Sequence, residues 1–144
     1  MNSEQPLQPA RRPAFLSVIL VLSFIGSGMG AVSNLFVYSV HPTLLELIES
    51  GVYDNFGFDL AFFSSINRSF FLLSGLLQVV SFTGVAQMWK LKRSGFHLYA
   101  ISQLMMLIMS TIYVYKPLGT YPMFDLLFAT LFILMYLRFR PIMN

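Results

Sequence analysis

The sequence contains no cysteine and few charged residues. Only 10% of its 144 residues are Asp, Glu, Lys or Arg, whereas about 25% are charged in an ordinary soluble domain. The missing cysteine excludes disulfide bonds, thiolate nucleophiles and cysteine-ligated zinc or iron–sulfur clusters. The nine Lys and Arg residues form no basic cluster large enough to follow a phosphate backbone, so we expect no nucleic-acid partner.

Apolar side chains are correspondingly abundant, at 56% of the residues, and the mean hydropathy is +0.70. A helix that crosses a bilayer needs about 20 mostly apolar residues, because in lipid its backbone polar groups must be satisfied within the segment. Four runs meet or approach this length, three without a charged residue and the fourth with Asp125 alone. We therefore predict an all-α integral membrane protein, a four-transmembrane-helix bundle that forms one domain. It covers residues 14–144 after a tail at 1–13, with spans at about 14–40, 69–89, 96–115 and 121–137.

The basic residues are distributed unevenly about these spans. Lys and Arg near span ends are retained on the cytoplasmic side. One side of the four-span arrangement holds only Arg68 and Lys116, and the other holds Arg11, Arg12, Lys90, Lys92, Arg93, Arg138 and Arg140. We therefore expect a multi-pass protein of a plasma membrane, the inner membrane of a bacterium, with both termini in the cytoplasm. An alternative stays open, because apolar residues 15–25 and small residues 26–31 also resemble a secretory signal peptide.

The segment between the first two spans, residues 41–68, is too apolar for a flexible linker. Leu and Ile alternate with Glu over residues 44–49, Pro42 precedes them and Gly51 follows. Proline in the first turn and glycine just past the end are typical of a short helix, and the alternation makes this one amphipathic. Such a helix can lie on the membrane surface or cap the bundle.

Aromatic residues crowd the next stretch, residues 53–63. Asp59 is a candidate cap of a helix that continues through Asn67 and Arg68 into the second span. We expect the whole outer segment to form a lid on the outer ends of the helices. An interfacial anchor with no ligand beneath it is the alternative.

Three amide side chains fall at membrane depth: Asn34 in the first span, Gln78 in the second and Gln103 in the third. Ser81 and Ser110 lie near the same helix faces as the two glutamines. Polar groups in the membrane must find partners, so they can join the helices by hydrogen bonds. They can instead line a polar cavity in the bundle, and the three amides are our candidate ligand-binding residues.

Gly26 and Gly30 are spaced four residues apart in the first span, so they lie on one helix face. Small residues let two backbones approach closely in lipid, where no hydrophobic effect drives helices together. We therefore predict helix packing at these glycines, either within the chain or between subunits.

Asp125 lies within the first turn or so of the fourth span, where a charged carboxylate is costly unless it is solvated or paired. Arg68 enters the second span at the same outer level. An ion pair between these two residues would compensate both charges. Pairing with Lys116 is the alternative, and the start of a helix also stabilises an acid.

No nucleophile with a credible base, phosphate-binding loop or pair of acids is evident, so we expect no enzyme, catalytic residue or cofactor. His41, Glu46 and Glu49 are too few for a metal site. The first hypothesis is a non-catalytic interaction or accessory subunit, or a self-associating bundle, whose partners are membrane lipids, itself or a larger membrane complex. The alternative is binding or transport of a lipid or another apolar small molecule in a cavity under the outer lid. No motif is specific enough to assign a family.

Overall fold

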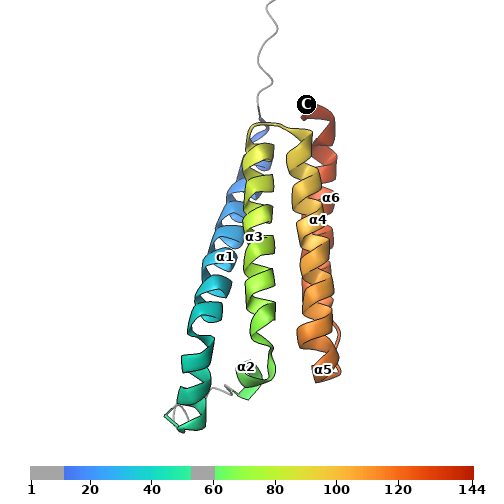
Figure 1. Ribbon diagram of the computed structural model, residues 1–144. Coiled ribbons are helices and arrows are strands. Elements are labelled where there is room, and N and C mark those ends of the chain that lie inside the picture. The colour runs from blue at the N-terminus through green and yellow to red at the C-terminus, as the bar shows by residue number, and fades with distance from the viewer. Residues whose placement is uncertain (1–11, 53–60) are drawn as a thin grey trace, which may run out of the picture.

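The computed structural model describes residues 12–52 and 61–144, of which residues 61 and 62 are described by their backbone only. All regular elements in these two ranges are helical (Figure 1). Three helices are long and apolar enough to cross a membrane. They are α1 (Ala14–Glu49), α3 (Arg68–Trp89) and the continuous helical stretch Arg93–Leu118. These helices confirm the all-α prediction and suggest a multi-pass membrane protein.

The remaining elements are shorter. The stretch after α3 consists of α4 (Arg93–Ser110), one π-helical turn (Thr111–Tyr115) and α5 (Lys116–Leu118), and Gly119 ends it in the left-handed conformation (φ 65°). The chain then returns as α6 (Met123–Phe139), which is followed by a 3-10 turn (Arg140–Ile142). With 17 residues, α6 is about 25 Å long. It is therefore shorter than the three candidate spans.

The first helix differs from its prediction. The sequence predicts a span that ends near residue 40 and a separate amphipathic helix after it, but α1 is one helix of 36 residues that continues through Pro42. A proline removes one backbone hydrogen bond without ending a helix whose neighbours support it. Here the carbonyl that Pro42 leaves without its helical donor is that of Tyr38, four residues earlier, and it accepts a hydrogen bond from Nε of Arg68 over 3.0 Å. The ring of His41, next to the proline, packs 5.7 Å from the ring of Phe71.

The entry into the second span also differs. Asp59 and the aromatic residues 53–60 lie outside the described residues. The helix expected to continue through Asn67 is instead divided into α2 (Ala61–Ser65) and α3. Asn67 takes an extended conformation (φ −62°, ψ 133°), and its side chain accepts a hydrogen bond from the backbone N–H of Ser69. The cap is therefore Asn67, and α3 begins at Arg68.

In the described part of the chain, α1 packs along α3 and α3 along α4, while α6 contacts α4 more than α1. Residue 12 and the C-terminal residues lie at the same end as the turn between α3 and α4 (Figure 1). There the guanidinium of Arg12 lies 4.1 Å from the centre of the Trp89 ring. The backbone N–H of Asn144 donates to the carbonyl of Leu91 over 2.7 Å. We call this the turn end.

The apolar core is concentrated at the turn end. It includes side chains from α1, α3, α4, α6 and the last residues: Leu16, Ile19, Leu20, Val85, Met88, Phe96, Tyr99, Tyr136 and Met143. Beside them α3 and α4 touch backbone to backbone, because a Cβ atom on Gly84 would lie 2.9 Å from the carbonyl oxygen of Gly95. A Cβ on Gly95 would likewise collide with the carbonyl oxygen of Gly84. Only glycine permits this approach.

Candidate functional site

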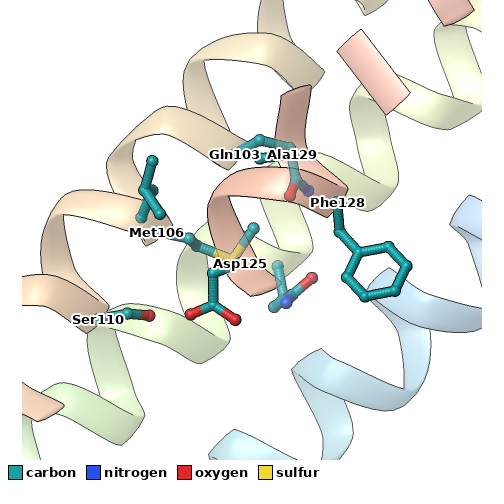
Figure 2. Close-up of a pocket in the computed structure, with 8 residues that line it drawn as sticks. Gln103, Met106, Ser110, Asp125, Phe128 and Ala129 are labelled. Carbon is teal, nitrogen blue, oxygen red and sulfur yellow. The ribbon is translucent and has the colours of Figure 1, made fainter. Parts of the chain in front are cut away.

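A cavity of about 250 Å³ lies between α3, α4 and α6, beyond the apolar core (Figure 2). Half of its lining is polar: Gln78, Gln103, Ser110 and Asp125. The other half is apolar: Met106, Leu107, Phe128 and Ala129. Figure 2 shows the Asp125 carboxylate, which projects from α6, among the α4 side chains of Met106 and Ser110.

A second cavity, of about 280 Å³, lies between α1, α3, α4 and α6. It shares three lining residues with the first cavity, namely Gln78, Gln103 and Phe128, so the two cavities adjoin. Its own lining residues are Leu22, Ser23, Gly26, Ser27, Ser81, Tyr99 and Phe132. We refer to the two cavities together as the cleft.

Gln78 and Gln103 lie near the middle of α3 and of the helical stretch Arg93–Leu118, two helices that are long and apolar enough to cross a membrane. Gln103 follows Arg93, the first residue of α4, by ten residues, which corresponds to about 15 Å along the helix. The hydrocarbon core of a bilayer is about 30 Å thick. In a bilayer that these two helices cross, the two amides would therefore lie where no water is available as a hydrogen-bond partner.

Hydrogen bonds between helices form the floor of the cleft. The amide of Gln103 donates to the hydroxyl oxygen of Ser81 over 3.2 Å, which joins α4 to α3. The hydroxyl of Tyr136 lies 3.0 Å from the carbonyl oxygen of Ile19 and 2.7 Å from the hydroxyl oxygen of Ser23, which joins α6 to α1. The Tyr99 ring packs edge-on against Tyr136, with 5.1 Å between ring centres. These contacts fix the helices that carry the lining residues.

Asp125 is the acid of the cleft, and none of the described residues that line its cavity is basic. A charged carboxylate near apolar surroundings needs solvent or a partner, and placement near a helix start stabilises it by about 0.3–1 kcal/mol. Asp125 is half-buried in the first turn of α6 and lies beside the hydroxyl of Tyr115. The helix start and the Tyr115 hydroxyl therefore both stabilise the charged carboxylate.

Two of the three predicted amides, Gln78 and Gln103, line both cavities. The third, Asn34, lies elsewhere, because its side chain donates to the carbonyl of Gly30 in its own helix over 2.8 Å. An amide that is satisfied four residues back along its helix needs no partner from another helix. The Asn34 side chain is therefore satisfied within α1, and it is not among the residues that line the cleft.

The structure places Arg68 and Asp125 with different partners. The Nε atom of Arg68 donates to the carbonyl of Tyr38 over 3.0 Å, and its guanidinium lies 4.2 Å from the centre of the Tyr38 ring. These contacts fasten α3 to α1. Asp125 lies instead in the wall of the first cavity, on α6.

The two predicted packing glycines have different surroundings. A Cβ atom on Gly30 would lie 2.9 Å from Cδ and Nε2 of Gln78, so Gly30 makes room for that side chain. Around Gly26 nothing lies within 4 Å of such an atom, and Gly26 borders the second cavity. The closest helix contact is at Gly84 and Gly95, two glycines that the sequence did not single out for packing.

His41 is buried against Ile66, whereas Glu46 and Glu49 are exposed on α1. Among the described residues, no group of three or more His, Asp or Glu side chains could hold a metal ion. Tyr99 and Phe128 line the cleft although the sequence did not point to them as lining residues. Helical spacing could have found them, because Tyr99 precedes Gln103 by four residues and Phe128 follows Asp125 by three.

No protein-family model, no curated protein and no solved structure matches this chain. The chemistry of the cleft is therefore the basis on which a function can be proposed.

Proposed function

We propose that this protein binds an amphipathic small molecule, or carries it across the membrane, in the cleft between its helices. The observation that supports the proposal is the position of Gln78 and Gln103 in the wall common to both cavities. Ligand pockets typically combine an apolar lining with a few polar groups that orient the ligand. A purely apolar molecule would offer no hydrogen bond to the Gln78 amide or to the amide oxygen of Gln103, whose nitrogen already donates to Ser81, and covering polar groups without pairing them costs free energy. A molecule with both a polar and an apolar part fits the lining better.

The proposal rests on the helices alone. The outer lid that the sequence predicts over residues 41–68 falls partly on residues 53–60, outside the described residues. The cleft is lined by α1, α3, α4 and α6, so the proposal does not require the lid. The hypothesis from the sequence was an apolar ligand beneath a lid, whereas the ligand proposed here is amphipathic and lies between the helices.

The test of this function is the retention of a ligand by the purified protein. The wild-type protein and the double variant Gln78→Leu/Gln103→Leu are purified in a mild detergent, and bound molecules are identified by native mass spectrometry. We expect the wild-type protein to retain a molecule and the double variant to retain at least about tenfold less, a loss of roughly 1.4 kcal/mol. The matched control is Gln87→Leu, because Gln87 accepts a hydrogen bond from Ser94 at the turn end and is not among the lining residues of either cavity. Equal retention by all three proteins, or none by any, would contradict the proposal.

We further propose four membrane spans with both termini in the cytoplasm. Six described cations lie at or near the turn end, which is the distribution expected on the cytoplasmic side; they are Arg12, Lys90, Lys92, Arg93, Arg138 and Arg140. Although α6 is short, it runs back from Gly119 toward this end, and the 3-10 turn extends it to Ile142.

The missing cysteine makes this topology simple to test. Single variants Ser50→Cys and Asn144→Cys are treated in intact cells with a maleimide that cannot cross the membrane. We expect the variant at Ser50, an exposed residue just after α1, to be labelled and the variant at Asn144 to be labelled only after the cells are permeabilised. Labelling at Asn144 in intact cells would show that α6 does not cross the membrane.

A second candidate function is that of a non-catalytic interaction or accessory subunit. It is favoured by Gly26, where an added Cβ atom would have nothing within 4 Å, and by the exposed residues beside it, Met29 and Val32. A helix of another subunit could approach α1 closely there. Mass measurement in lipid nanodiscs tests it. Self-association that Gly26→Leu abolishes would support the role, whereas a monomer with no partner recovered from native membranes would contradict it.

A further inference from the structure

The first cavity combines a carboxylate, neutral hydrogen-bonding groups and apolar surface in a lining that contains no base. Asp125 supplies the carboxylate, Gln78 and Gln103 supply the amides, and Phe128 and Met106 supply apolar surface. Figure 2 shows the Asp125 carboxylate beside Met106 and Ser110 of α4. The lining is therefore electrically unbalanced toward negative charge.

The basic residues of the described chain are engaged or located elsewhere. Arg68 is held by Tyr38, and Arg12 lies over the Trp89 ring at the turn end. Arg93 donates from Nε to the carbonyl of Met143 over 2.7 Å, also at the turn end. Lys116 is exposed on α5 and does not line the cavity. Hence the charge of Asp125 can be balanced by a cation that enters from outside the chain.

The apolar part of the lining favours an organic cation over a metal ion. Metal ions such as Ca²⁺ and Mg²⁺ are bound by six or more oxygen ligands, whereas this lining has one carboxylate, two amides and one hydroxyl beside four apolar side chains. A quaternary ammonium group needs no hydrogen-bond acceptor, and aromatic rings such as that of Phe128 attract it through the negative face of the ring. Carbon substituents on such a cation can pack against Met106, Leu107 and Ala129.

We propose that the cleft selects amphipathic molecules that carry one positive charge, and that the carboxylate of Asp125 holds that charge between α4 and α6. This inference rests on the proposed function, because it names the class of molecule that the same cleft takes. It gives Asp125 a role that neither an ion pair within the chain nor the helix start supplies.

The experiment compares two probes of the same shape. Benzyltrimethylammonium carries a positive charge, and neopentylbenzene is its neutral carbon analogue. Binding of each is measured by calorimetry or by saturation-transfer NMR to the full chain in nanodiscs of zwitterionic lipid. We expect the wild-type protein to bind the cation at least tenfold more tightly than the neutral analogue. We expect Asp125→Asn to lose at least tenfold in affinity for the cation and to leave the neutral analogue unchanged.

Two further variants complete the test. Asp125→Glu keeps the charge, so it should retain cation binding within about threefold. Glu46→Gln removes an exposed acid of α1 outside the cleft, so it should leave both affinities unchanged. Equal binding of the two probes by the wild-type protein would overturn the charge selectivity, and so would undiminished cation binding by Asp125→Asn. Either result would leave the proposed function intact, because the cleft would still bind a small molecule. Failure of both probes to bind the wild-type protein would also overturn the charge selectivity. The proposed function would still be tested separately, by comparing ligand retention of the wild-type protein with that of Gln78→Leu/Gln103→Leu.

Discussion

The two halves of this helical bundle are built differently. At the turn end, helices α1, α3, α4 and α6 meet around side chains with no exposed surface, such as Leu16, Met88 and Tyr136. In the opposite half, α1 and α3 remain in contact, because Gly75 leaves room for Leu35. Between α3, α4 and α6, however, that half contains a polar cavity instead of a core.

We expect this difference to separate stability from the proposed ligand binding. Close packing holds helices together in lipid because van der Waals contacts, rather than a hydrophobic effect, drive their association. The packed half can supply these contacts, so the cleft can remain open and polar without the helices separating. Substitutions in the packed half should therefore change the free energy of unfolding, whereas substitutions in the cleft should mainly change ligand binding.

The largest effect is expected where α3 crosses α4. In Gly84→Ala or Gly95→Ala, the added methyl group meets backbone atoms of the opposing helix, which cannot turn aside as a side chain can. We expect a loss of about 1–3 kcal/mol in the free energy of unfolding, measured by reversible denaturation in mixed micelles. Gly26→Ala is the matched control, because its methyl group meets nothing within 4 Å. Equal stability of the three variants would show that the packed half tolerates separation of α3 from α4.

A smaller effect is expected at the link between α6 and α1. Tyr136→Phe removes the hydroxyl that contacts Ile19 and Ser23 but keeps the buried ring. Hydrogen bonds between membrane helices contribute about 0.6 kcal/mol on average, so we expect a loss near that value, measured by the same denaturation. Tyr121→Phe is the control, because Tyr121 is 81% exposed. An unchanged stability in Tyr136→Phe would mean that α6 is held by ring packing alone.

The sequence predicts the helical segments well because uncharged length is a local property. The predicted span 69–89 differs from α3 by one residue at its start, and the predicted span 96–115 lies within the helical stretch Arg93–Leu118. Pro42 misled the prediction for α1, since proline marks a helix boundary only where neighbouring residues do not support the helix. That support comes from Arg68, a residue distant in the sequence, whose Nε donates to the Tyr38 carbonyl that the proline leaves free.

Partners between helices were harder to predict. Asn34 and Gln78 are both amides at membrane depth, yet Asn34 bonds to its own helix and Gln78 faces the cleft. Composition does not distinguish these outcomes, because an amide can bond to its own helix or face a neighbouring one. The contact of Gly84 with Gly95 likewise depends on the angle at which two helices cross. The two glycines lie on either side of one short turn, and this placement could have indicated the close contact between α3 and α4.

The smallest change in stability is expected from Gly30→Ala, which tests whether the hollow half differs from the packed half. Its methyl group would lie 2.9 Å from Cδ and Nε2 of Gln78, which form the far end of a flexible side chain. That side chain can turn to another rotamer, at a cost of about 0.5–1.5 kcal/mol if it leaves its preferred angles, whereas alanine in place of glycine returns about 1 kcal/mol of helix propensity. These terms nearly cancel, so we expect the free energy of unfolding to change by no more than about 0.5 kcal/mol.

Ligand retention should nevertheless fall, because the amide of Gln78 moves relative to that of Gln103 in the wall that both cavities share. Native mass spectrometry and denaturation of the same preparation measure both effects. A loss of stability as large as that of Gly95→Ala would show that Gln78 is packed as rigidly as the backbone at the turn end, and the distinction between the two halves would not hold.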